Sequence, residues 1–225
     1  MTKALYFLQM DQMRCAANVM SASASPEVDH LILDQTVFYP QGGGQPSDTG
    51  IIEWEGGKMI VGKVFWEGDS ILHRGEITGE RPSPGTPVKC SIDEEKRRLH
   101  TRLHSAGHLI DMALAQMGSD LIPEKGHHFP DGPYVQYKGE ISVEDREAFQ
   151  KQLEEKIREL IAQNLKSEIH VDRAVESGKV PRKVYWGDYG MPCGGTHVAS
   201  LGEIGAVIIR GIKNKKGSIK VKYGV

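Results

Sequence analysis

The sequence predicts an α+β protein with two parts, a small antiparallel β-barrel-like domain at the N-terminus followed by an α+β domain. Two observations lead to this prediction. The chain up to about Cys90 consists of short β-branched runs separated by glycine-containing turns, which is typical of an all-β domain. Directly afterwards the apolar residues recur at helical spacing, and strand-like runs return later in the chain.

The N-terminal domain is expected to cover residues 1–88. Glycine-rich turns such as 42–44 separate its strands at a spacing typical of a small sheet or barrel. Residues 79–87 contain three prolines and can continue neither a helix nor a central strand, so they mark the predicted domain boundary. The predicted strands of this domain cover residues 31–33, 36–39, 50–52, 59–61 and 63–66.

The second domain is expected to cover residues 89–225 and to begin with a long amphipathic helix. Ser91 and Glu94 fit a capping box at the start of this helix, and Gly118 fits a stop signal at its end. The further predicted elements are a second helix that begins after Ser142, a strand at 134–137, and a hairpin formed by 206–209 and 218–221.

The bulk composition is that of an ordinary globular protein. The 225 residues are 39% hydrophobic and 26% charged, and no apolar run approaches the roughly 20 residues that cross a bilayer. The N-terminus lacks the apolar stretch of a signal peptide, so we expect a cytoplasmic protein with no membrane partner. Cys15, Cys90 and Cys193 are odd in number and far apart, and we expect reduced thiols.

The net charge of −2 gives no overall signal for nucleic acid, but the basic residues are clustered. The stretch from Arg210 to Lys222 contains six basic residues and no acidic one. A second cluster, formed by residues 96–98 with Arg102, lies within a run of histidines. Both clusters could contact phosphates, and a solvated basic surface explains them equally well on charge alone.

The histidine run marks the first predicted helix. His100, His104 and His108 recur every four residues, a spacing that places neighbours on one helix face, where two imidazoles can bind one ion. A single pair at this spacing is a weak motif. The glutamate of a zinc-protease helix is missing between His104 and His108. We expect His100 to be an exposed helix residue rather than a ligand.

A second pair of ligand residue types, Cys193 and His197, encloses the residues Gly194-Gly195-Thr196. Glycines let the backbone turn tightly enough to aim both side chains at one point. Thiolate and imidazole are ligands that zinc prefers, so these two residues and the pair His104 and His108 predict one zinc ion in the α+β domain. Four protein ligands would form a closed structural site, whereas a catalytic site keeps a position for water, and ligand counting leaves both open.

Taken together, these motifs resemble a known family. The two ligand pairs resemble the editing domain of alanyl-tRNA synthetase and its free-standing relatives, the AlaX proteins, and the threonyl-tRNA synthetase editing domain has a similar set. Residues 38–50 (FYPQGGGQPSDTG) resemble the glycine-rich motif of the domain that precedes the editing domain. Residues 125–132 (KGHHFPDG) resemble the loop after the first histidine pair. With both domains but no aminoacylation domain, the chain is similar to the medium-sized AlaX type.

The resemblance implies ATP-independent hydrolysis, in trans, of the ester that joins a wrong amino acid to tRNA(Ala). Serine is the leading amino acid and glycine a further one, and the implied cofactor is one zinc ion. Zinc would polarise the ester carbonyl or deliver hydroxide; alternatively it would bind the substrate amino group. No catalytic residue is assigned beyond the metal site. Glu124 falls near the position of a pocket glutamine, and Gly107 stands where the synthetase carries threonine.

The resemblance also implies binding residues. For the glycine-rich stretch, a plain tight turn between strands is the alternative, and His127 and His128 are by default exposed loop residues. Contacts to tRNA phosphates are expected from Lys213, Lys215, Lys216 and Lys220. The implied substrate-binding residues are Gly43, Gly44, Gln45, Gly126, His128, Gly195 and Thr196.

Two other functions remain open at this point. The same four ligands could close a structural site in a zinc-stabilised RNA-binding module without catalysis. The chain could also be a deacylase for threonyl-tRNA or for an ester that is not a tRNA. Both a monomer and a dimer are compatible with the sequence.

Overall fold

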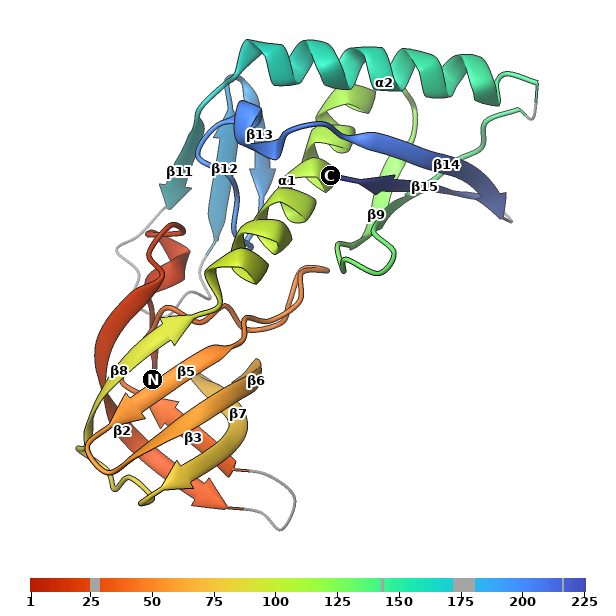
Figure 1. Cartoon of the computed structure of the whole chain (residues 1–225). Coiled ribbons are helices and arrows are strands. Elements are labelled where there is room, and N and C mark those ends of the chain that lie inside the picture. Colours follow the sequence, from red (N-terminus) through yellow and green to blue (C-terminus); the bar gives the residue numbers. More distant parts are fainter. Residues whose placement is uncertain (25–28, 143, 172–180, 216) are drawn as a thin grey trace.

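The computed structural model describes residues 1–24, 29–142, 144–171, 181–215 and 217–225. It has a closed barrel at one end and a helix-and-sheet half at the other, and helix α1 runs from the barrel into the second half (Figure 1). The predicted class, an antiparallel barrel followed by an α+β part, is confirmed. No helix in the described ranges is both long and apolar enough to cross a membrane.

The barrel closes in the strand order β2-β3-β7-β6-β5-β8, and all its neighbouring strands are antiparallel. A two-stranded parallel pair, β1 (Lys3–Ala4) with β4 (Gln35–Thr36), and the short helix η1 (Leu5–Phe7) lie beside it. The barrel strands are β2 (Arg14–Ala24), β3 (Asp29–Leu33), β5 (Gly50–Trp54), β6 (Gly57–Glu67), β7 (Ser70–Gly79) and β8 (Pro87–Ile92).

Two strand predictions in this half need correction. The runs predicted at 59–61 and 63–66 form the single strand β6, with a register shift between Val61 and Lys63. The strand predicted at 36–39 ends at Thr36. Side chains bind the next backbone N–H groups in place of a neighbouring strand: the Phe38 N–H donates to Thr36 Oγ1, and the Tyr39 N–H donates to Asp48 Oδ2.

In the second half, α1 (Glu94–Gln116) is capped by Asp93, whose carboxylate accepts from the Lys96 N–H. The predicted cap at Ser91 is wrong, because Ser91 belongs to β8 and pairs with Arg14 of β2. The helix stops before Gly118, which has the left-handed φ of 68° that favours glycine. The second helix is α2 (Arg146–Gln163), preceded by a contact between Ser142 and Asp145.

A four-stranded antiparallel sheet, β14-β15-β10-β9, packs one face against the helices, and a three-stranded sheet, β11-β12-β13, completes this half. The predicted strand at 134–137 and the C-terminal hairpin are confirmed. The division of the domains at residue 88 stays a prediction, although the last barrel strand runs on to Ile92. The remaining elements are β9 (Ile122–His127), β10 (Tyr134–Lys138), β11 (Ser167–Val171), β12 (Arg182–Trp186), β13 (Tyr189–Pro192), η2 (Leu201–Ile204), β14 (Ile208–Lys215) and β15 (Ser218–Gly224).

A buried ion pair joins the two halves. Arg97, in the second turn of α1, and Asp48, at the end of the glycine-rich motif, are each 1% exposed and pair through two guanidinium nitrogens. Arg97 also donates to the backbone oxygens of Val37 and Met10. Because a buried charge is costly unless it is fully paired, these bonds fix the start of α1 against the barrel.

Candidate metal centre

The four predicted metal ligands come together. His104 and His108 lie one turn apart on α1, and Cys193 and His197 lie in the loop after β13. Their four ligand atoms all lie within 4.8 Å of one another. The Nε2 atom of His104 is 3.1 Å from His108 Nε2 and 3.1 Å from Cys193 Sγ. Three imidazoles and one thiolate at such spacing form a group that could hold a metal ion.

The unpaired nitrogens of this group test whether it fits a metal. His104 and His197 are 0% and 3% exposed, yet among the described residues His104 Nδ1 and both ring nitrogens of His197 have no hydrogen-bond partner. Burial and the positive groups nearby hold the pKa of both imidazoles well below the usual value, so both are neutral. A metal binds one nitrogen of a neutral imidazole, and His197 offers such a buried, unpaired nitrogen, which costs free energy while it lacks a partner. The residues therefore fit a bound metal.

His108 and Cys193 shift each other's pKa in opposite directions. Burial by itself lowers the pKa of His108, but hydrogen bonds with Asp111 and Cys193 outweigh it and raise the pKa to about 10. Burial raises the pKa of the Cys193 thiol, and the hydrogen bond and charge of His108 outweigh that effect and lower it. The lowered pKa of Cys193 favours the thiolate, which is the form that binds metals.

An outer set of residues orients these ligands. His108 Nδ1 lies 3.3 Å from Asp111 Oδ2, and the Tyr137 hydroxyl donates to Asp111 Oδ1 at 2.5 Å. A carboxylate behind a ligating histidine fixes which ring nitrogen faces the metal. Sequence reasoning missed both residues, although the spacing of Asp111 three residues after His108 on a helix was an available signal.

Arg182 on β12 holds the ligand loop from behind. Its guanidinium donates to the Cys193 backbone oxygen at 2.7 Å, to Phe7 O at 2.6 Å, and to the Gly195 oxygen. Gly195 has no room for a side chain, because a Cβ there would lie 2.3 Å from His104 Cε1. The loop therefore depends on a buried arginine and a glycine, and no motif in the sequence pointed to this arginine.

The glycine-rich motif of the barrel contacts this loop directly. Gln45 and Thr196, both 0% exposed, bond twice: Gln45 Nε2 donates to Thr196 Oγ1 at 2.9 Å, and the Thr196 N–H donates to Gln45 Oε1 at 3.0 Å. Thr101 of α1 bonds the same Thr196 hydroxyl at 2.6 Å. Gly43 is exposed, and a Cβ on it would lie 3.9 Å from His104 Cε1.

The other predicted substrate residues, Gly44, Gly126 and His128, lie together beside the metal group. The His128 N–H donates to Gly44 O at 2.8 Å, and the His128 ring centroid is 4.8 Å from that of His104. The expectation of an exposed His128 is wrong: it is 3% exposed, and its Nδ1 bonds Tyr223. Gly107 and Gly126 both pack against the His128 ring.

Two further expectations concern single residues. His100 was expected to be exposed and is 7% exposed, since this face of α1 turns toward the barrel; it lies outside the group of ligand atoms. Glu124 is exposed on β9, where its carboxylate accepts from Gln136 and Ser218. Of the predicted tRNA contacts, Lys213 and Lys220 face each other across β14 and β15. Lys216 lies outside the described residues, as does the side chain of Lys215.

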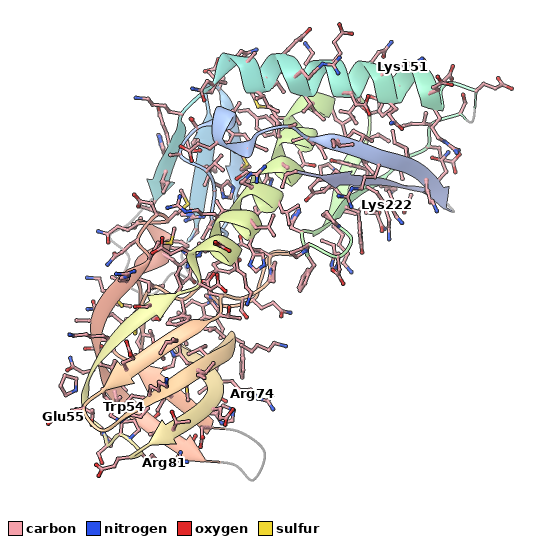
Figure 2. The ribbon with its side chains drawn as sticks, in the orientation of Figure 1. Trp54, Glu55, Arg74, Arg81, Lys151 and Lys222 are labelled. Carbon is pink, nitrogen blue, oxygen red and sulfur yellow. The ribbon has the colours of Figure 1, made fainter. Side chains whose placement is uncertain are left out.

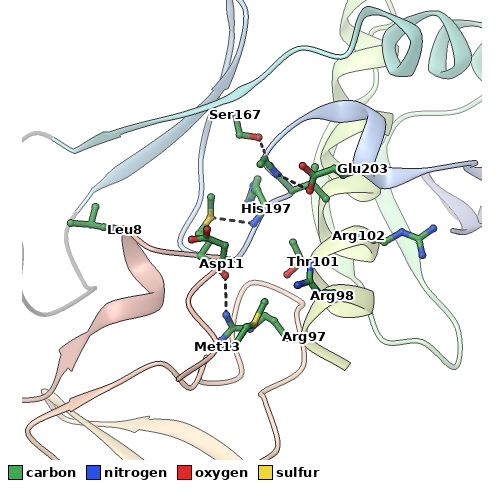
Figure 3. A pocket seen from close by; sticks show the side chains of 13 residues that line it. Leu8, Asp11, Met13, Arg97, Arg98, Thr101, Arg102, Ser167, His197 and Glu203 are labelled. Carbon is green, nitrogen blue, oxygen red and sulfur yellow. Dashed lines mark hydrogen bonds between the residues drawn. The ribbon is translucent and has the colours of Figure 1, made fainter. Parts of the chain in front are cut away.

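A cavity of about 580 Å³ lies where the barrel, α1 and the ligand loop meet (Figure 3). His197 and Thr101 form part of its wall, together with Arg98 and Arg102 of α1. Leu8 and Asp11 line it from the barrel side. The metal group therefore has a cavity beside it, at His197.

The chain is similar to several known proteins. Residues 6–96 match the family model of class II (A) tRNA synthetases, and residues 183–220 match that of the second additional domain of threonyl and alanyl tRNA synthetases. The alanyl-tRNA editing protein AlaX-L of Pyrococcus horikoshii is 27% identical over 92% of this chain and 54% of its own length. The alanine–tRNA ligases of Thermofilum pendens and Korarchaeum cryptofilum are 31% and 32% identical over 86% of this chain. The chain spans about half of that editing protein and 23% of each ligase.

Proposed function

Because this chain belongs to the AlaX family of alanyl-tRNA editing proteins, we propose that it hydrolyses mischarged tRNA(Ala) in trans. The leading substrate is Ser-tRNA(Ala), with Gly-tRNA(Ala) as a further one. The observation that carries the proposal is the group of three histidines and one cysteine, in which both buried ring nitrogens of His197 have no partner in the described part of the chain. The medium-sized AlaX type and a cytoplasmic location belong to the same proposal.

We propose zinc as the ion, held by His104, His108, Cys193 and His197. Thiolate together with imidazole suits zinc better than magnesium or calcium, which prefer oxygen ligands. Zinc, when bound, would act as a Lewis acid that polarises the ester carbonyl. An aminoacyl ester is already activated, so this polarisation is enough to help water attack it.

The protein side of the reaction is mainly positioning. Arg182 fixes the loop that carries Cys193, and Asp111 fixes His108. His104 and His197 are buried, whereas His108 and Cys193 are partly exposed, so the substrate approaches from the side of the latter two. The exposed Gly43 also lies beside His104.

The predicted substrate residues divide into two roles. Gly43 has an exposed backbone at the rim and can approach the substrate closely. Gln45 and Thr196 are fully buried against each other, so we propose that they hold the glycine-rich loop in place over the ligand loop. Selection of serine over alanine then requires a polar group that bonds the serine hydroxyl, since an unpaired polar group disfavours alanine.

One assay tests the proposal. The purified protein is incubated with tRNA(Ala) charged with serine, glycine, threonine or alanine, and release of the amino acid is followed. We expect rapid release of serine, slower release of glycine and little release of alanine. Cys193→Ala, which removes a metal ligand, is the matched control. Hydrolysis of Ser-tRNA(Ala) no faster than with Cys193→Ala contradicts the proposal.

The family model shared with threonyl tRNA synthetases makes a threonyl-tRNA deacylase the second candidate. Thr-tRNA(Thr) in the same assay separates the two functions. A zinc-stabilised RNA-binding module would show no hydrolysis with any charged tRNA. X-ray absorption at the zinc edge would then show four protein ligands and no exchangeable position.

A further inference from the structure

The sheet β14-β15-β10-β9 has one buried face and one open face. Residues of the inward face, such as Val135, Tyr137, Ile219 and Val221, are at most 4% exposed and belong to the core. Residues paired in antiparallel register share a face of the sheet. The register pairs therefore place one set of polar and aromatic residues on the open face: Lys213 with Lys220, Lys220 with Gln136, Lys222 with Tyr134, Lys138 with Ser218, Gln136 with Lys125, and Tyr134 with His127.

The open face is strongly basic. It carries lysines on all four strands: Lys213 on β14, Lys220 and Lys222 on β15, Lys138 on β10, and Lys125 on β9. In Figure 2, Lys222 lies on the side of this sheet that faces away from α2. Within the described part of this face the one acidic residue is Glu124, and its carboxylate is engaged by Gln136 and Ser218.

A column of rings crosses this face. Lys220 Nζ lies 3.7 Å from the centroid of the Tyr134 ring, which stacks on His127 at 5.1 Å. His127 stacks on Phe129 at 4.6 Å with 15° between the ring planes. Phe129 is partly exposed, and its ring contact in the described part of the chain is His127, so Phe129 is the end ring of the column there.

The Phe129 end of the column is the end nearer to the metal centre. Phe129 follows His128, whose backbone N–H donates to Gly44 O and whose ring lies 4.8 Å from that of His104. A base stacked on Phe129 would therefore lie beside the glycine-rich motif, next to the metal ligands. Lysines along the same face would meet the phosphates that precede this base.

We propose that the open face of this sheet binds the single-stranded 3′ end of a tRNA. Phe129 extends the ring column under one base, and the lysines contact the adjacent phosphates. Stacking on aromatic rings combined with Lys contacts is the general way in which proteins hold single strands without reading sequence. The inference rests on the proposed function for the identity of the RNA, and it adds Phe129, His127, Tyr134, Lys125, Lys138 and Lys222 to the predicted contacts.

Binding of uncharged tRNA(Ala) tests this surface without any need for hydrolysis. Fluorescence anisotropy compares intact tRNA with tRNA trimmed of its unpaired 3′ nucleotides. We expect Phe129→Ala to weaken binding of intact tRNA about tenfold and to leave binding of trimmed tRNA unchanged. Phe129→Tyr keeps the ring and should bind as the wild type does. Tyr185→Ala removes a similarly exposed ring on the other sheet and should have no effect.

The lysines are tested through salt dependence. Replacing Lys213 and Lys222 by Gln should reduce the slope of log affinity against log salt by roughly 0.7 to 0.9 per lysine. Lys58→Gln, which removes an exposed lysine of the barrel, should leave this slope unchanged. The proposal is overturned if Phe129→Ala weakens binding of intact and trimmed tRNA equally, or if it does not weaken binding at all. The face would then be a general surface for polyanions. If these binding effects hold while Ser-tRNA(Ala) is not hydrolysed, the proposed function fails and the binding surface stands.

Discussion

His73 in the barrel and His197 in the metal centre are both buried but have opposite hydrogen-bonding states. His73 is 0% exposed, and both of its nitrogens are paired: Nε2 with Thr36 Oγ1 at 2.9 Å and Nδ1 with Leu31 O at 3.1 Å. His197 is 3% exposed, and neither ring nitrogen has a hydrogen-bond partner within the residues that the structure describes. Burial lowers the pKa of both imidazoles, so both are neutral. The barrel provides hydrogen-bond partners for both nitrogens of His73, whereas the described part of the metal centre provides none for those of His197.

This difference separates a structural histidine from a ligand. Buried polar groups are nearly always hydrogen-bonded, so an unpaired one requires an explanation. His73 would lose bonds if a metal were to bind it, whereas His197 would gain its first one. The comparison therefore predicts that the two histidines respond differently to metal.

The largest expected effect is stabilisation by zinc. At a zinc concentration a thousandfold above its dissociation constant, the free energy of unfolding should rise by about 4 kcal/mol. His197→Ala should lose most of this gain, whereas His73→Gln should keep all of it. Urea unfolding with zinc and with a chelator measures the gain for each variant.

Because each gain is a difference within one variant, the loss of packing in His197→Ala cancels. A full zinc-dependent gain in His197→Ala would show that His197 is not a ligand. Loss of the gain in His73→Gln would break the distinction between the two histidines.

A smaller effect is expected from protonation of His73 in the barrel by acid. Burial lowers the pKa of His73 to about 4, against about 6.5 in the unfolded chain. Between these values the unfolded state binds the extra proton, so stability is complete above pH 6.5 and falls as the pH drops toward 4. The expected loss is about 3 kcal/mol.

His73→Gln, which can keep both hydrogen bonds without titrating, is the comparison for this window. Urea unfolding at several pH values should show a smaller acid loss in His73→Gln than in the wild type. Parallel pH curves for the two proteins would contradict a role for His73.

Much of the fold was predictable because its signals are local. The long first helix, its end at Gly118 and the C-terminal hairpin follow from apolar spacing and glycine positions. Strand β2 (Arg14–Ala24) was missed because its small and polar residues form no β-branched run, and only the pairing with β3 and β8 makes it a strand. Strand β7 (Ser70–Gly79) was missed as well, and it is held by pairing with β3 and β6.

The candidate site was predictable where spacing alone brings residues together. Helical spacing aligned His104 with His108, and a glycine loop aligned Cys193 with His197. Spacing could not show which face of the helix meets the barrel, so His100 was expected to be exposed. It also could not show that His128, just after β9, is buried next to the metal ligands. Arg182 acts through three backbone oxygens, a role that leaves no pattern in the sequence.

The smallest expected effect concerns His108, which lies between the two extremes of the comparison. One of its nitrogens has a protein partner, Asp111, and the other faces the ligand group. Asp111→Asn keeps the shape but removes the charge behind His108, so zinc affinity should fall about tenfold, at the low end of the effect of such outer residues. Competition with a chromophoric chelator measures the affinity, and the absorption spectrum of bound cobalt reports the ligand geometry. Tyr137→Phe removes the hydroxyl that supports Asp111 and should weaken binding less than Asp111→Asn does, because Asp111 keeps its charge. If the zinc affinity of Asp111→Asn is unchanged, Asp111 does not support His108 as a ligand, and His108 then resembles His197.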